Sequence, residues 1–303
     1  MILSKGKAKS SFMKLKMVVA LGGIACCVVL GACWQKQQEA SSAEAESEAT
    51  DTLTRENAEE AADTLLLDKE TAETPMPATV DEFFGDFIYN FDQSNRLQRS
   101  RIVFPLPITE TNGEQRLIER RDWKHHYLFL QQEFCTVLWN SHKQMDLAQD
   151  TSLTHARVEQ IYLHSRKIQA FLFERDSLSR QWMLVGEQII PFEHTELSSF
   201  LDFYRQFSTD SIFQRQHVVE PLQFTMVDEE NEYELVNGVI NRDQWFEFQP
   251  DMPRDVLINI NYGQTYNRRS RIYMQMRGIN NGLQTLFTFQ RKGEQWQLKA
   301  FEN

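Results

Sequence analysis

The segment Phe84-Gly-Asp-Phe-Ile-Tyr-Asn-Phe91 occurs a second time, in altered form, as Phe200-Leu-Asp-Phe-Tyr-Arg-Gln-Phe207. At this offset of 116 residues, nine of the 23 positions from 84 to 106 are identical without a gap. In both copies apolar residues recur every three or four positions, which is the spacing of one buried face of a helix. We therefore predict two copies of one domain, each opened by a Phe-rich helix.

The similarity continues beyond this helix in the same order, with small length changes in the loops. The matching pairs are Leu97-Gln98-Arg99 with Phe213-Gln214-Arg215, Pro105-Leu106 with Pro221-Leu222, Asp122-Trp123 with Asp243-Gln-Trp245, Phe173-Glu-Arg175 with Phe289-Gln-Arg291, and Gln181-Trp182 with Gln295-Trp296. We place the first repeat at 80–194 and the second at 195–303.

Each repeat reads as helices, a hairpin, a short helix and then an antiparallel meander. In the first repeat, Asn112-Gly113 is a hairpin turn signal between the strand-like stretches 102–108 and 115–121. The meander strands are predicted at 133–140, 157–164, 167–175 and 180–190, and at 255–262, 270–277, 283–291 and 295–301. The expected fold class is α+β, with N-terminal helices packed on a curved antiparallel sheet.

This element order, with the pattern Phe-x-x-Phe, then Phe/Leu-Gln-Arg, then Pro-Leu, resembles the nuclear transport factor 2-like superfamily of cone-shaped α+β rolls. More specifically, it looks like a family of Bacteroidetes lipoproteins of unknown function with that fold. The resemblance covers residues 80–303 and implies two tandem rolls. Its motifs are structural, so it implies no activity.

The N-terminus has the composition of an export signal. Residues 1–16 contain five lysines and no acid, and the uncharged stretch from Met17 to Trp34 ends in Leu30-Gly-Ala-Cys33. These four residues look like a bacterial lipoprotein box, which predicts a signal peptide over 1–32 and a lipid-modified Cys33. The alternative is an uncleaved anchor, since the uncharged run of 18 residues could just span a bilayer.

Residues 33–79 are predicted to be a flexible linker. Positions 34–79 hold 12 acidic and three basic residues, a composition that cannot bury enough apolar surface to fold. We expect a protein of the bacterial cell envelope, held to the membrane by lipid at Cys33. A periplasm-facing position is favoured, because the first acid after Cys33 is Glu39, whereas surface-exposed lipoproteins of Bacteroidetes carry acids close to the lipidated cysteine.

The overall charge and the missing motifs exclude several classes of function. With 32 basic and 43 acidic residues the chain has a formal net charge of −11, which argues against nucleic acid as a partner. Its four cysteines are too few for a disulfide scaffold, and its histidines have no metal-ligand spacing. There is no phosphate-binding loop or nucleophile motif. No cofactor and no metal are expected.

Candidate site residues come from two groups. The tryptophans that recur in both repeats, Trp123, Trp182, Trp245 and Trp296, are candidates for ligand stacking, although packing is the simpler interpretation. The second group, Asp122, His125 and His126, is the densest carboxylate–imidazole cluster. Such a pair could exchange protons in an isomerase- or hydratase-like enzyme, whereas the simpler interpretation is a solvated helix end.

The favoured function is a non-catalytic ligand-binding or scaffolding module of the envelope. Its partner would be an envelope protein or a small apolar or carbohydrate ligand. The alternatives are an enzyme that uses a pocket in the first repeat, and a structural protein whose sheet faces dock a partner.

Overall fold

The computed structural model describes residues 78–303, apart from 229–233, 267–269 and 280. The chain divides into two units, Met1–Thr74 and Pro75–Asn303, and all the described residues belong to the second. The predicted signal peptide, Cys33 and the linker up to residue 77 lie outside the described residues. None of the helices in the described part has the length and apolarity needed to cross a bilayer.

The order of the elements follows the sequence-based expectation closely. We call η1 to β6 the first half and η3 to β12 the second half. The first half contains η1 (Ala78–Asp81), α2 (Phe84–Gln93), α3 (Asn95–Ser100), β1 (Leu106–Thr109), β2 (Gln115–Ile118), β3 (Phe134–Trp139), η2 (His142–Gln149), β4 (His155–Tyr162), β5 (Lys167–Arg175) and β6 (Trp182–Pro191). The second half contains η3 (Phe192–His194), α4 (Ser198–Thr209), α5 (Ser211–His217), β7 (Val218–Val227), β8 (Leu235–Ile240), α6 (Arg242–Phe248), β9 (Val256–Asn261), β10 (Arg271–Gly278), β11 (Gln284–Lys292) and β12 (Gln295–Glu302).

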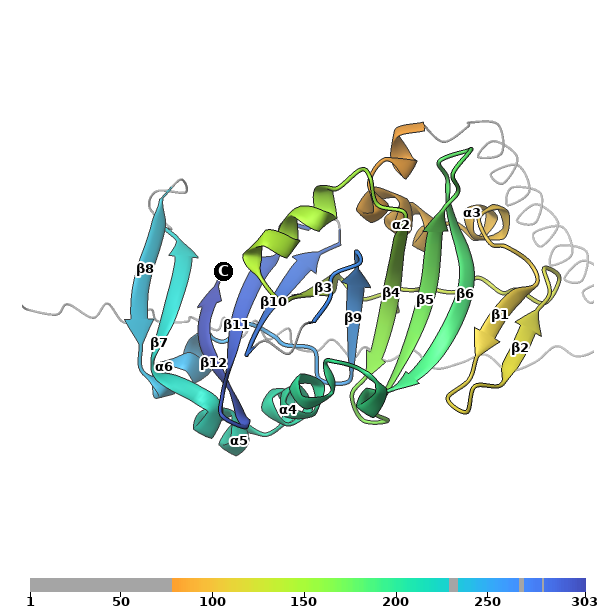
Figure 1. The fold of residues 1–303 in the computed structure, drawn as a ribbon. Coiled ribbons are helices and arrows are strands. Elements are labelled where there is room, and N and C mark those ends of the chain that lie inside the picture. Colours follow the sequence, from red (N-terminus) through yellow and green to blue (C-terminus); the bar gives the residue numbers. More distant parts are fainter. Residues whose placement is uncertain (1–77, 229–233, 267–269, 280) are drawn as a thin grey trace, which may run out of the picture. The chain divides into compact units, whose positions relative to one another are not determined.

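All the strands join one 12-stranded, mostly antiparallel sheet, where two separate rolls would each have a sheet of their own. The strand order is β2-β1-β6-β5-β4-β9-β3-β10-β11-β12-β7-β8 (Figure 1). At its centre the halves exchange a strand: β9 of the second half pairs with β4 of the first, and β3 of the first pairs with β10 of the second. Counted inward from either edge, the corresponding strands of the two halves follow in the same order: β2-β1-β6-β5-β4 from one edge and β8-β7-β12-β11-β10 from the other.

The exchange is possible because β3 and β9 are buried on both sides. Five of the six residues of each strand are buried. Neighbouring side chains of a strand point to opposite faces of a sheet. Accordingly Val137 packs with α2 and Leu138 packs with α4, while Ile258 and Leu257 divide in the same way. Strands with two buried faces can serve two cores at once.

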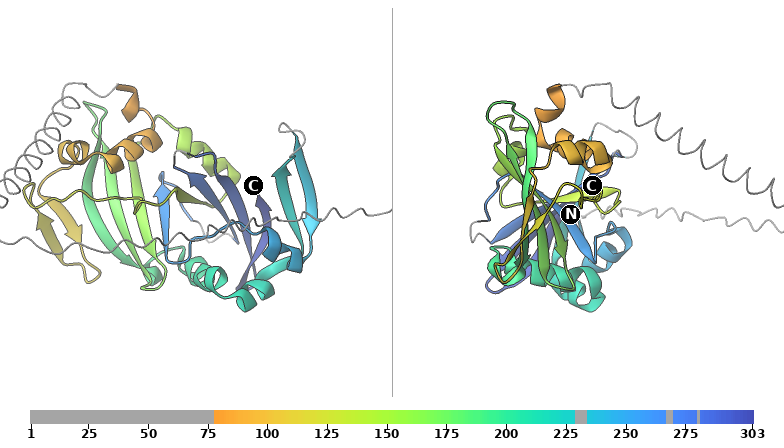
Figure 2. Two further views of the ribbon diagram at one scale, coloured as in Figure 1. Left: turned by 180° about the vertical axis from the view of Figure 1, so that it is seen from behind. Right: turned by 90° about the vertical axis from the view of Figure 1, so that its right-hand side faces the viewer.

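The two hydrophobic cores therefore lie on opposite faces of the sheet. On one face, which we call the α2 face, α2 buries Phe84, Phe87, Ile88 and Phe91 against the sheet. On the other, the α4 face, α4 buries its own Phe-rich stripe. In Figures 1 and 2 the helices α2 and α3 lie at the upper end of the sheet, and α4 and α5 lie at the lower end.

Side chains hold the parallel contact between β3 and β9, where only one residue pair, Thr136 and Asn259, is in ladder register. The side chain of Asn259 accepts a hydrogen bond from the Leu138 N–H at 2.9 Å and donates one to Glu159 at 2.6 Å. The Thr136 hydroxyl donates to the Ile258 carbonyl at 2.9 Å. Polar side chains thus replace much of the backbone ladder at the centre of the sheet.

The short helix expected after the first hairpin is present only in the second half. There Asn241 and Gln244 form a capping box at the start of α6. In the first half the corresponding segment is a series of turns held by the buried Gln98. The Gln98 side chain donates to the His126 carbonyl at 2.8 Å and accepts from the His126 N–H at 3.1 Å. A buried amide therefore fixes a loop where no capping box starts a helix.

Candidate functional site

The four tryptophans of the predicted site are buried in the two cores. Their exposed fractions are 0% for Trp182 and Trp245, 4% for Trp123 and 5% for Trp296. Trp182 packs edge-on against Phe84 at a centroid distance of 4.9 Å, and Trp296 does the same with Phe200 at 5.3 Å. These are the positions of packing residues, whose rings already contact other rings of the core.

The structure does not bring the predicted acid–base cluster together. Asp122 is exposed beside Arg121. The His125 ring nitrogen Nε2 lies 2.8 Å from the Asp92 carbonyl oxygen. The His126 ring packs on Phe171, and burial lowers its pKa, although a hydrogen bond from Gln160 opposes the shift. Each of the three side chains thus has a different environment.

Sequence reasoning missed one buried carboxyl group near these histidines. Asp92, at the end of α2, is 1% exposed and accepts a hydrogen bond from the Phe129 N–H at 3.1 Å. Burial raises its pKa, while the hydrogen bonds from Phe129, Leu128 and Gln93 and the nearby His125 oppose the shift. Nothing in the sequence around Asp92 indicates that it is buried, beyond its place near a helix end.

Replacing Asp92 by asparagine should change how stability depends on pH. A raised pKa means that the folded protein binds more protons than the unfolded chain between the unfolded and folded pKa values. The wild type should therefore lose stability as the pH rises through that window, and Asp92→Asn should lose less. Urea denaturation at several pH values from 3 to 7 measures the difference. Parallel profiles for the two proteins would contradict the assignment.

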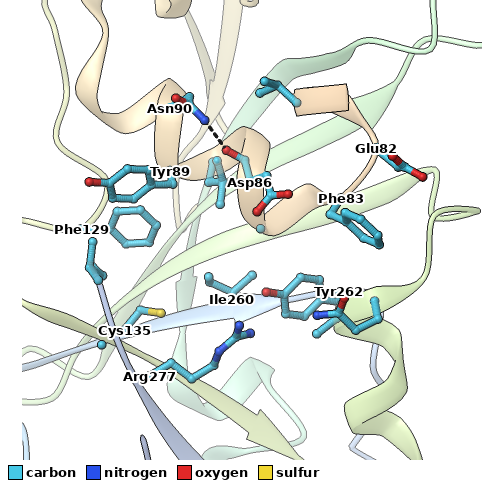
Figure 3. A pocket seen from close by; sticks show the side chains of 17 residues that line it. Glu82, Phe83, Asp86, Tyr89, Asn90, Phe129, Cys135, Ile260, Tyr262 and Arg277 are labelled. Carbon is cyan, nitrogen blue, oxygen red and sulfur yellow. Dashed lines mark hydrogen bonds between the residues drawn. The ribbon is translucent and has the colours of Figure 1, made fainter. Parts of the chain in front are cut away.

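A cavity of about 670 Å³ lies on the α2 face, between α2 and the exchanged strands. Its upper wall in Figure 3 is α2, and its floor is formed by β3, β9, β10 and the residues that follow β9 and β10. Aromatic rings line its sides, and polar side chains come from both walls. The lining includes the side chains of Asp86, Phe129, Cys135, Ile260, Tyr262 and Arg277 (Figure 3).

The whole sequence from residue 62 to residue 303 matches a protein-family model described as Domain of unknown function (DUF4348). The chain belongs to the DUF4348 family. It is also similar to an NTF2-like protein from Bacteroides fragilis with a solved crystal structure. The two share 40% sequence identity, with a TM-score of 0.69, over 75% of this chain and 98% of that chain. Comparison with curated proteins found no match.

These similarities assign an NTF2-like fold of mixed α+β class to the DUF4348 chain. They do not assign a site, so the cavity has to be understood from its own chemistry. Cavities of 300–1,000 Å³ with a few polar groups are the usual size of small-molecule sites. The cavity of the DUF4348 chain is within this range.

The floor of the cavity in the DUF4348 chain contains a tyrosine, an arginine and a cysteine. Burial raises the pKa of Tyr262 to about 12, although the positive charge of Arg277 and its hydrogen bond to Tyr262 oppose the shift. Burial likewise raises the pKa of the Cys135 thiol to about 11. Both groups therefore keep their protons at neutral pH, so Tyr262 is a hydrogen-bond donor and Cys135 is not an activated nucleophile.

The sequence did not reveal this cavity, because its residues come from separate elements. Asp86 was visible only as one of a repeated pair with Asp202, and neither Tyr262 nor Arg277 belongs to a repeated motif. Neither the candidate tryptophans nor Asp122, His125 and His126 line the cavity. Among the described residues, no group of three or more potential ligands could hold a metal ion.

Proposed function

We propose that this DUF4348 protein is a non-catalytic module that binds a small ligand in the cavity under α2. The observation that carries the proposal is a difference between the two halves. The first half keeps an open cavity on its helix-covered face, whereas the matching positions of the second half are filled by core side chains.

The comparison depends on the proposed duplication, with repeats at 80–194 and 195–303 that exchange their first meander strand. Strand register gives the matching positions. In the β3–β10 pair Arg277 lies opposite Cys135, and in the β4–β9 pair Ile161 lies opposite Leu257. In the duplication β3 corresponds to β9 and β10 corresponds to β4. The Cys135–Arg277 pair of the first therefore matches the Leu257–Ile161 pair of the second.

Three residues that leave space or polarity in the first half have large apolar counterparts in the second. Cys135 and Arg277 correspond to Leu257 and Ile161, and Gly85 of α2 corresponds to Leu201 of α4. The three apolar counterparts are 0% exposed. Apolar side chains that fill such a site add buried area and stabilise the fold. A fold that fills this site in one half and leaves it open in the other supports a use for the open one.

The same proposal includes the location of the protein. We propose a lipoprotein of the bacterial envelope, anchored at Cys33, carried on the linker of 33–79 and facing the periplasm. The support is the Leu-Gly-Ala-Cys box, the basic start and the acidic linker. The residues expected to act in an isomerase- or hydratase-like enzyme, Asp122, His125 and His126, do not line this cavity, so we favour the binding function.

A variant that fills the cavity tests the binding function. Gly85→Leu, Cys135→Leu and Arg277→Ile together copy the second half into the first. A Cβ at Gly85 would meet only the Tyr262 hydroxyl oxygen, at an ordinary contact distance of 3.6 Å. Native mass spectrometry of gently extracted protein should find a bound small molecule on the wild type and none on the triple variant.

Arg121→Ile is the control, because it removes the same charge at a side chain that is 86% exposed. The control should keep the ligand and the triple variant should melt no lower than the wild type. If the triple variant does not fold, the single variant Gly85→Leu is used in its place to fill part of the cavity. A filled variant that retained the same small molecule would place the ligand elsewhere and refute the proposal.

A further inference from the structure

Two opposite charges face each other across the cavity without forming an ion pair. Asp86 comes from α2 above, and Arg277 comes from β10 below, with the Tyr262 hydroxyl between them (Figure 3). No described residue forms an ion pair with either side chain. The matching aspartate of the second half, Asp202, is paired with Arg166. The lack of a partner for Asp86 is therefore particular to the half that has the cavity.

A second acid, Glu82, also lines the cavity. Glu82 points away from Asp86 in Figure 3, and its charge acts on Arg175. The charge of Asp86 acts on Tyr262. Arg277 and Asp86 are thus the cation and the anion on either side of the Tyr262 hydroxyl.

The Arg277 guanidinium and the Tyr262 hydroxyl are arranged to hold an anion. Arg277 is hydrogen-bonded to Tyr262, and Tyr262 keeps its own proton because burial raises its pKa. A guanidinium that donates to the tyrosine oxygen leaves the hydroxyl hydrogen free to point into the cavity. The guanidinium and the hydroxyl then offer several donors to one acceptor, which is the arrangement that binds a carboxylate.

Asp86 would hold a cation, and apolar side chains line the same cavity. A carboxylate such as that of Asp86 accepts from an ammonium group. The Ile88, Phe129 and Ile260 side chains belong to the apolar part of the lining. A ligand that spans the cavity would therefore need an ammonium group at one end, a carboxylate at the other and an apolar body.

We propose that the ligand is a zwitterionic amino-carboxylate: an amino acid or a very short peptide with free termini and apolar side chains. Its carboxylate binds Arg277 and Tyr262, its ammonium group binds Asp86, and its side chains pack on Phe129 and Ile260. This inference rests on the proposed binding function of the same cavity and names the class of its ligand.

Three forms of one dipeptide test the charges separately. Isothermal titration calorimetry would compare leucyl-phenylalanine with its N-acetylated form and its C-terminal amide. The free dipeptide should bind the wild-type protein at least about tenfold more tightly than either blocked form, because each block removes one charge-assisted contact. The triple variant with Gly85→Leu, Cys135→Leu and Arg277→Ile, in which the cavity is filled, should bind none of the three peptides.

Two variants assign each charge to its residue. In Asp86→Asn the advantage of the free dipeptide over the N-acetylated form should disappear, while its advantage over the amide remains. In Arg277→Gln the reverse should hold. Circular dichroism spectra and melting curves check that both variants fold. A loss of binding that is equal for all three peptides in both variants would overturn the charge assignment.

The outcomes separate this inference from the binding function. Equal affinity of the three peptides for the wild type, lost in the filled variant, would overturn the zwitterion and leave the cavity as a binding site. Binding of none of the three at millimolar concentration would also overturn the zwitterion. The mass-spectrometric comparison would then decide the binding function by itself.

Discussion

Replacing Asp81 by alanine is expected to lower the free energy of unfolding by about 3–5 kcal/mol, because it leaves a buried guanidinium without its counter-ion. Asp81 binds Arg101 through two hydrogen bonds, at 2.8 and 2.9 Å, and the two side chains are only 12% and 9% exposed. Asp81 also accepts a hydrogen bond from the Trp182 N–H at 3.0 Å. It thereby joins η1, the end of α3 and the start of β6.

Asp243→Ala is the matched control for Asp81→Ala. It removes a carboxylate that is 79% exposed from its pair with Arg215, which is 52% exposed. Exposed pairs of this kind contribute less than about 1 kcal/mol. Urea denaturation of the two variants and the wild type measures both effects. Equal losses in the two variants would show that the buried pair contributes no more than the exposed one.

Replacing Trp182 by alanine is expected to cost about 3–5 kcal/mol of stability, which is the usual range for a fully buried large aromatic side chain. The ring contacts Phe84 of α2, and the Arg175 guanidinium lies 5.8 Å from its centroid. The buried indole N–H has no hydrogen-bond partner among the described residues. The loss would therefore come from packing and from the contact with Arg175, without a lost side-chain hydrogen bond.

Trp182→Phe separates packing from a role in ligand binding. It keeps a ring beside Phe84 and removes the unpaired N–H, so it should cost much less than the alanine variant. Because Trp182 does not line the cavity, neither variant should change the affinity for a bound ligand while it remains folded. Weaker binding with unchanged melting would instead make Trp182 a stacking residue.

Most of the strands could be predicted from sequence because each carries its own pattern. The stretch 167–175 was predicted as a strand and is β5, Lys167–Arg175, a short run rich in apolar residues bounded by charged ones. The Phe84 and Phe200 stretches were predicted as helices, and both form helices with buried Phe faces. Local periodicity was sufficient for these elements.

The strand exchange could not be predicted, because a local pattern does not specify a partner. Phe134–Trp139 and Val256–Asn261 are buried on both sides, so either could have paired within its own repeat. The pairing depends on side-chain contacts such as that between Asn259 and Leu138, which lie 121 positions apart. The cavity was missed for the same reason, since Asp86, Tyr262 and Arg277 meet only after the strands have paired.

The exchange also determines when the molecule can finish folding. Sheets built from contacts distant in the chain are slow to form, since a long loop must close before they stabilise anything. A chain that emerges from its N-terminus has β3 early, but the neighbours of β3 are β9 and β10, which arrive only with the last third of the sequence. Until then β3 and one edge of β4 present unpaired backbone N–H and C=O groups, which can pair with other chains. A fragment that ends at residue 194 would lack the partners that β3 has in the full chain, so the two halves complete their sheet only together.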